Sequence, residues 1–201
     1  MFVIIRRSFH HLDKDTFLPL YKAMVRTHLD FCASVYSPLH QKDKDRIEQV
    51  QRRATRQLPG MQHLSYPERL RELQLLTLTY RRARSDMIEL YKMTKGIYEK
   101  ALCPTIKLWK EAATRPPSRA HDLAIFPTHC RTSLRKNSFI NRSTSAWNKL
   151  PPSVVHAPSL DAFKRRLDSH WSTQDALYEY RSTISNNNAH ATTTTNRLST
   201  Q

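Results

Sequence analysis

The sequence predicts a mainly α-helical fold: a basic helical module of the bundle type, with one or two short strands near residues 123–134 and a disordered C-terminal tail. Two observations indicate it. Apolar side chains recur at the three- to four-residue spacing that gives a helix one buried face. Capping residues stand where such helices would begin, and Pro or Gly stands where they would end. The chain has only two glycines, so glycine-rich phosphate-binding loops are absent.

Two long helices are expected at the start of the chain. The first covers about residues 15–36, because Phe17, Tyr21 and Val25 begin an apolar stripe that continues along it, and Pro38 follows its end. The second covers about residues 43–58. Its expected apolar side consists of Ile47, Val50, Ala54 and Leu58, and its basic side of Arg46, Arg52, Arg53 and Arg56.

A short helix and a long helix are expected next. Ser65 and Glu68 have the spacing of a capping box, in which each residue satisfies a free amide of the first turn. The long helix covers about residues 77–95 and carries a stripe of Tyr and Leu residues. Gly96 fits its C-terminal stop.

The second half of the chain is divided by prolines. Residues 101–122 contain Pro104, Pro116 and Pro117 and few apolar anchors, which predicts an irregular linker. Helices are expected at about residues 138–150 and from Ser159 to Trp171. The predicted organisation is a helical region at 1–100, the linker at 101–122, a C-terminal helical module at 123–171, and a mostly disordered polar tail at 172–201.

The chain is strongly basic, with 33 Lys and Arg against 17 acidic residues and a formal charge of +16. Such an excess attracts polyanions, above all nucleic acid. The candidate binding residues form three clusters that contain few acids. They are Arg52, Arg53 and Arg56; Arg81, Arg82 and Arg84; and Arg131, Arg135, Lys136 and Arg142. A solvated charged face is the alternative interpretation of each cluster.

Catalytic and metal sites are not expected. The paired aspartates that a polymerase uses to hold two metal ions are missing. Acidic pairs such as Asp13 with Asp15 stand at helix starts, where they stabilise the free amides. The three cysteines form no CxxC pair, so a zinc site built from Cys103, His121, His129 and Cys130 is disfavoured. Trp147 and Trp171 lie on apolar stripes, which favours burial over stacking on bases.

Several strings resemble the region after the palm in jockey-like non-LTR (LINE-type) retrotransposon reverse transcriptases. The strings run in the family's order from residue 4 to residue 171. They are Ile4-Ile5-Arg6-Arg7-Ser8-Phe9 with Thr16-Phe17, Tyr21-Lys22 and Val25-Arg26; Ile47-Glu48-Gln49-Val50-Gln51-Arg52-Arg53-Ala54; Leu64-Ser65-Tyr66-Pro67-Glu68-Arg69-Leu70; Leu76-Thr77-Leu78-Thr79-Tyr80-Arg81-Arg82; and Phe139, Arg142 and Trp147-Asn148-Lys149-Leu150-Pro151 with Phe163-Lys164 and Leu167-Asp168.

The resemblance implies a C-terminal fragment of an RNA-directed DNA polymerase. It makes residues 1–100 thumb-like, and it implies binding of template RNA or RNA–DNA duplex. Upstream palm and endonuclease domains would be partners in an intact parent, and Mg²⁺ would belong to the palm, so no cofactor is expected here. The alternatives are a nonfunctional translated relic of a mobile element, or an independent basic helical module that binds RNA or protein. A nuclear or cytoplasmic location without a membrane is expected, since no apolar run could span a bilayer and the start lacks the charge order of a signal peptide.

Overall fold

The computed structural model describes residues 13–99, 101, 103–112 and 121–184, and this part of the chain is mainly helical, as the sequence predicts. The first helical stretch is Lys14–Leu20 (α2), six π-helical residues Tyr21–Arg26 (η1) and Thr27–Asp30 (α3). The next helices are Gln41–Arg56 (α4), Tyr66–Glu72 (α5) and Leu78–Thr94 (α6). After a short 3₁₀ turn at Trp109–Glu111 (η3) come Ser133–Lys136 (α7), Phe139–Asn148 (α8), Pro152–Val155 (α9), Leu160–His170 (α10) and a final 3₁₀ turn at Asp175–Leu177 (η4).

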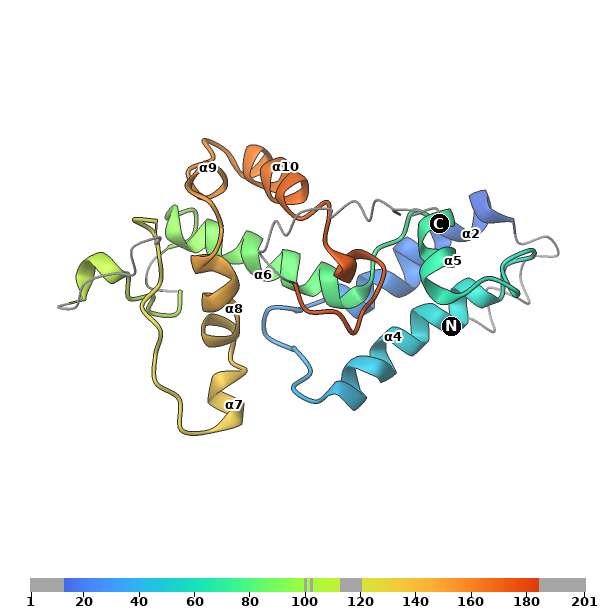
Figure 1. Ribbon diagram of the computed structural model, residues 1–201, viewed down its shortest axis with the longest axis horizontal. Helices are drawn as coiled ribbons and strands as arrows, with labels where there is room; N and C mark the ends of the chain where they lie inside the picture. Colours follow the sequence, from blue (N-terminus) through green and yellow to red (C-terminus); the bar gives the residue numbers. More distant parts are fainter. Residues whose placement is uncertain (1–12, 100, 102, 113–120, 185–201) are drawn as a thin grey trace, which may run out of the picture.

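Helix α6 runs through the middle of the molecule (Figure 1). It contacts α3, α4, α8 and α10, with α10 above it and α8 below it in the view of Figure 1. Thr77 caps its first turn by accepting a hydrogen bond from the Tyr80 amide, as the sequence predicts for a helix that begins there. Helix α6 therefore belongs to the expected helical region at 1–100 and also packs against the helices of the expected C-terminal module at 123–171.

Buried aromatic residues hold α6, α8 and α10 together. The rings of Tyr91 and Phe163 stack with centroids 4.3 Å apart, and Tyr80 meets Trp171 edge to face at 5.8 Å. Trp147 is fully buried beside Phe163. Burial of side chains this large is the main stabilisation available to this half of the fold, at roughly 25 cal/mol for each Å² of apolar surface removed from water.

A second cluster of buried residues joins the start of the chain to α4 and α5. Phe17 stacks on Tyr21, and both pack with Ala54, Leu58 and Leu70. The first helix ends at Asp30, six residues before the predicted end. Cys32 lies in the left-handed region at φ 49°, and the turn leaves Phe31, Val35 and Tyr36 exposed. A periodic apolar pattern continues through these residues, but here it does not face a core.

The short strands expected near residues 123–134 are absent from the described part of the chain. One antiparallel bridge joins Leu108 to Ile125. The rest of the segment is held by side chains of α8: the Trp147 indole donates to the Leu123 carbonyl at 2.9 Å, and the Asn148 amide bonds both backbone groups of Ile125. Side chains thus satisfy the backbone groups that a neighbouring strand would otherwise bond.

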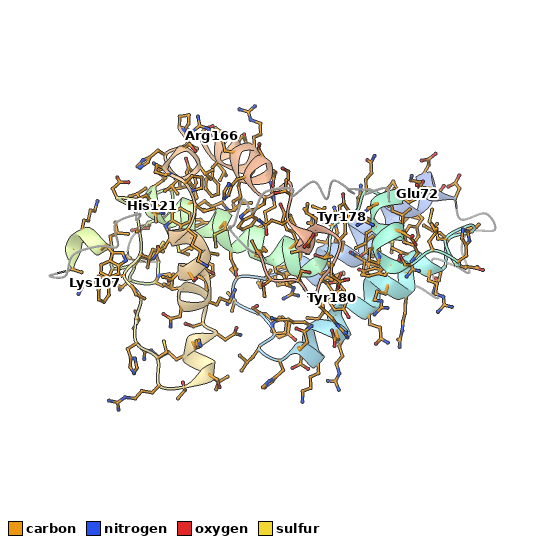
Figure 2. The ribbon with its side chains drawn as sticks, in the orientation of Figure 1. Glu72, Lys107, His121, Arg166, Tyr178 and Tyr180 are labelled. Atoms are coloured by element: carbon orange, nitrogen blue, oxygen red, sulfur yellow. The ribbon has the colours of Figure 1, made fainter. Side chains whose placement is uncertain are left out.

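The predicted boundary of the tail at residue 172 is too early. Ala176 is fully buried, and its carbonyl accepts a hydrogen bond from the Thr77 hydroxyl at 2.6 Å. Tyr180 is buried against Tyr66, with ring centroids 6.4 Å apart; Figure 2 labels Tyr178 and Tyr180 in this C-terminal segment. The segment therefore packs on the folded part of the chain through Ala176 and Tyr180, and the rest of the expected disordered tail, 185–201, lies outside the described residues.

Candidate nucleic-acid interface

Helix α4 has one exposed basic face and one buried polar face. Arg52, Arg53 and Arg56 are exposed, as predicted, in its last two turns. The opposite face was expected to be apolar, yet Glu48 is only 1% exposed and Gln51 is fully buried. A helix places residues three and four positions apart on one side, so this polar pair lies in line with Ala54 and Leu58 against the core.

The buried polar face is a continuous hydrogen-bond network. The Tyr21 hydroxyl donates to the Gln51 side chain at 2.7 Å, and the Gln51 amide donates to the Tyr66 hydroxyl at 3.0 Å. Tyr66 in turn donates to the Glu48 carboxylate at 2.6 Å, which also accepts the free amide of Leu78 at the start of α6. The network thus fixes α4 against α5 and α6, and orients the arginines on the other side.

Burial raises the pKa of Glu48 from its ordinary value of 4.5 to about 7, although the hydrogen bonds from Tyr66 and Leu78 and the charge of Arg52 oppose that shift. Burial, together with the Glu48 charge, also raises the pKa of Tyr66 far above its ordinary value. These two groups lie behind the arginines and not among them. A pKa of about 7 leaves Glu48 about half protonated at neutral pH, so the buried face neutralises the exposed one only in part.

The exposed cluster on α4 has few partners within the protein. Arg52 lies over the Tyr66 ring at 5.4 Å from its centroid. Among the described residues, Arg53 and Arg56 form no hydrogen bond or ion pair. The pKa of the neighbouring Arg69 is lowered, first by burial and then by the charges of Arg52 and Arg56. The positive groups repel one another, and a bound anion would relieve that repulsion.

The predicted cluster on α6 has another role. Arg81 pairs with Asp30 at 2.6 Å, and Arg84 forms a two-point ion pair with Asp168 at 2.6 and 2.8 Å. Arg82 is buried and donates to the carbonyls of Tyr36 and Leu29 at 2.7 and 2.8 Å. These three side chains join segments far apart in the sequence. Each of the three is thus engaged in a contact within the protein, and their assignment as a binding cluster stays a prediction.

The last predicted cluster contains both exposed cations and one paired arginine. Arg131, Arg135 and Lys136, on and before α7, are exposed and form no ion pair with another described residue. Arg142 is instead paired with the buried Asp86 at 2.9 Å. Helix α7 lies well apart from the C-terminal half of α4 in Figure 1, so the two exposed clusters belong to separate parts of the molecule.

Sequence reasoning missed the polar network behind the interface. Its signal was present: Glu48, Gln51 and Thr55 recur at helical spacing on the face where apolar residues were expected. The burial of Trp147 and Trp171, both 0% exposed, agrees with their predicted place in a core. In the described part of the chain, no three His, Cys, Asp or Glu side chains are placed to hold a metal ion.

Comparisons of this chain with models of protein families, with curated proteins and with solved structures find no match. None of the helices among the described residues is both long and apolar enough to span a bilayer. Function must therefore be argued from the sequence strings and from the geometry.

Proposed function

We propose that this chain is a nucleic-acid-holding C-terminal fragment of a non-LTR retrotransposon reverse transcriptase. It binds template RNA or RNA–DNA duplex and performs no polymerisation itself. The family assignment is supported by the ordered strings between residues 4 and 171, and several residues of these strings have structural roles in this chain. Trp147 and Asn148 hold a backbone segment, and Glu48 and Gln51 anchor α4.

One observation carries the binding function: six cations remain free of ion pairs with described residues, whereas four that the sequence grouped with them are paired or buried. The free set is Arg52, Arg53, Arg56, Arg131, Arg135 and Lys136. An ion pair within the protein already satisfies a guanidinium, so only unpaired cations gain fully from a phosphate. The rigid network beneath Arg52 holds one half of this set in place.

Binding through these groups is sequence-independent and depends on salt. Each phosphate contact releases condensed counterions, so log affinity falls linearly with log salt. Six contacts correspond to a loss of roughly a thousandfold in affinity between about 50 and 200 mM salt. Base edges are not needed for this attraction, and duplexes of different sequence should bind alike.

The test is fluorescence anisotropy with a labelled RNA–DNA hybrid across a salt series. Arg53→Glu should weaken binding and flatten the salt dependence. Arg165→Glu is the matched control, because Arg165 is an equally exposed arginine on α10, away from the α4 cluster. Circular dichroism must show that both variants fold. Equal losses in the two variants, or binding by the wild type that ignores salt, would contradict the assigned interface.

A further inference from the structure

A cavity of about 230 Å³ lies where α4, α6 and α8 meet, and the loop that precedes α4 also lines it. Apolar walls come from Ile47, Leu78, Met87 and Ala146. Sites for drug-sized ligands usually measure about 300–1,000 Å³, so this cavity has room for a smaller, single ring system. Apolar walls with a few converging polar groups are the usual composition of a ligand site.

One polar group in the wall has an unused hydrogen-bonding position. The terminal nitrogens of Arg82 are held by the carbonyls of Tyr36 and Leu29. Its Nε is buried, and no other described residue accepts a hydrogen bond from it. A buried donor without an acceptor costs about 1–3 kcal/mol, and native proteins contain few of them. Arg82 lines the cavity, but its Nε has no exposed surface, so an acceptor in the cavity reaches Nε only when the Arg82 side chain turns.

Free positive charge flanks the cavity on two sides. Lys44 of α4 lines it, and Arg52 follows eight residues later, about 12 Å along the same helix at 1.5 Å per residue. Asn137 lines it from the other side, directly after Arg135 and Lys136 of α7. A ligand with a ring and attached phosphates would place the ring inside and the phosphates toward these cations.

We propose that this cavity receives one nucleobase, and that the Arg82 side chain turns on binding so that a ring nitrogen or carbonyl oxygen accepts its Nε–H. The base comes either from a free nucleotide or from an unstacked position in a single strand; the second source rests on the proposed function. Unstacked bases are the form in which proteins read RNA, and their faces pack against apolar or aromatic side chains. Lys44, Arg135 and Lys136 would hold the phosphates beside the base.

The test fills the cavity without changing its charge. Ala83 lines the cavity from α6, so Ala83→Leu places an isobutyl group there. Ala23→Leu, at an exposed position on η1, is the matched control. Each protein is titrated with a single-stranded RNA hexamer and with the same hexamer lacking one central base. In parallel, saturation-transfer NMR measures binding of AMP and UMP.

We expect the wild type and Ala23→Leu to bind the intact hexamer about tenfold more tightly than the abasic one, which is the order of one lost base contact. Ala83→Leu should lose this preference and keep its salt dependence. A mononucleotide signal that Ala83→Leu abolishes assigns the site to free nucleotides. Weaker binding of the abasic hexamer without a mononucleotide signal assigns the site to a base within a strand.

Equal binding of the intact and abasic hexamers, with no mononucleotide signal, overturns the nucleobase site. The proposed function then still stands if both hexamers bind with a steep salt dependence, and fails if neither binds. Should Ala83→Leu not fold, methyl NMR of the wild type decides. The Met87 methyl, which lines the cavity, must shift on adding the intact hexamer while that of the exposed Met24 does not. An unshifted Met87 refutes the proposal.

Discussion

Arg142 and Asp86 form a two-point ion pair in the interior: Nε and one terminal nitrogen of Arg142 each lie 2.9 Å from an oxygen of Asp86. The same guanidinium donates to the carbonyls of Ala33 and Ser34. One side chain thus joins α8, α6 and the turn after α3. Burial raises the pKa of Asp86, and the hydrogen bonds and charge of Arg142 oppose that rise.

Replacing Arg142 with Met should destabilise the fold by about 3–5 kcal/mol, because it leaves the Asp86 carboxylate buried without a partner. Chemical denaturation measures the loss. The double variant Arg142→Met with Asp86→Leu should recover part of it, since neither charge then remains buried. The carbonyls of Ala33 and Ser34 lose their donor in both variants, so recovery should be incomplete. A double variant no more stable than the single one would show that the ion pair is not the main contribution.

The sequence was sufficient to place the longer helices, though not α7 and α9, because caps and apolar periods are local signals. Thr77 and Ser159 accept hydrogen bonds from the amides three residues on, and Glu68 bonds the amide of Ser65 at 2.7 Å. Such contacts depend on residues within one turn. The end of the first helix was misplaced because its apolar pattern runs past Asp30 into exposed residues, and a pattern alone does not show whether a core faces it.

The sequence could not predict which arginines form ion pairs within the protein and which remain free. Arg84 and Asp168 are 84 positions apart, and Arg81 and Asp30 are 51 apart, so the pairing depends on how distant helices pack. Arg53, by contrast, is exposed because the opposite side of its own helix is buried. An arginine run on a helix therefore predicts a charged face, and tertiary packing decides which members remain free.

Glu48 should make stability fall as pH rises. Its pKa is about 7 in the fold and near 4.5 in an unfolded chain. Between these values the folded state binds a proton that the unfolded state has released, so the free energy of unfolding decreases with pH. The stabilisation is full below about pH 4.5 and is lost as pH passes 7. Its size is about 3 kcal/mol, at 1.36 kcal/mol for each pKa unit.

Glu48→Gln removes this titration and keeps an oxygen that can accept from Tyr66. We therefore expect the variant to gain about 3 kcal/mol relative to the wild type between pH 4.5 and pH 8. The comparison between proteins is needed because the lowered pKa values of His121 and His170 make stability rise with pH in both. Glu72→Gln, at an exposed position, is the control. Parallel pH profiles for wild type and Glu48→Gln would contradict the assignment.

Trp147→Ala should lower the stability of the fold more than it lowers the affinity for RNA. The side chain is fully buried, packs on Phe163 and His121, and donates to the Leu123 carbonyl. Removing a buried aromatic of this size costs about 3–5 kcal/mol through lost burial and the remaining cavity. Trp109→Ala, at a half-buried position against Phe126, should cost less. A stable Trp147→Ala protein with much weaker RNA binding would instead assign Trp147 to stacking on bases.

Truncation should separate the folded part of the C-terminal segment from the rest. Ending the chain at Trp171 removes Ala176 and Leu177, whose carbonyls accept hydrogen bonds from the hydroxyl and amide of Thr77. It also exposes the face of Tyr66 that Tyr180 covers. This truncation should lower the melting temperature by several degrees, as expected for a loss of one or more kcal/mol. Ending at residue 184 keeps these contacts and should change it little; equal effects would contradict the packing.

The last prediction separates paired from free arginines by their effect on the salt dependence of RNA binding. Arg84 is already bonded to Asp168, and that pair is partly exposed, so Arg84→Gln should cost less than about 1 kcal/mol of stability. Because Arg84 is not expected to contact phosphate, the slope of log affinity against log salt should stay unchanged. Arg53→Gln should leave stability nearly unaltered and reduce that slope by about one, the value for one phosphate contact.

The two variants remove the same charge from neighbouring helices, so a general effect of net charge would change both slopes alike. Asp168→Asn adds a further check. It frees Arg84 from its partner and should raise affinity at low salt if the released guanidinium can reach a phosphate. A slope that drops equally in Arg84→Gln and Arg53→Gln would mean that the ion pair with Asp168 opens on binding. In that case the α6 arginines would take part in the interface as well.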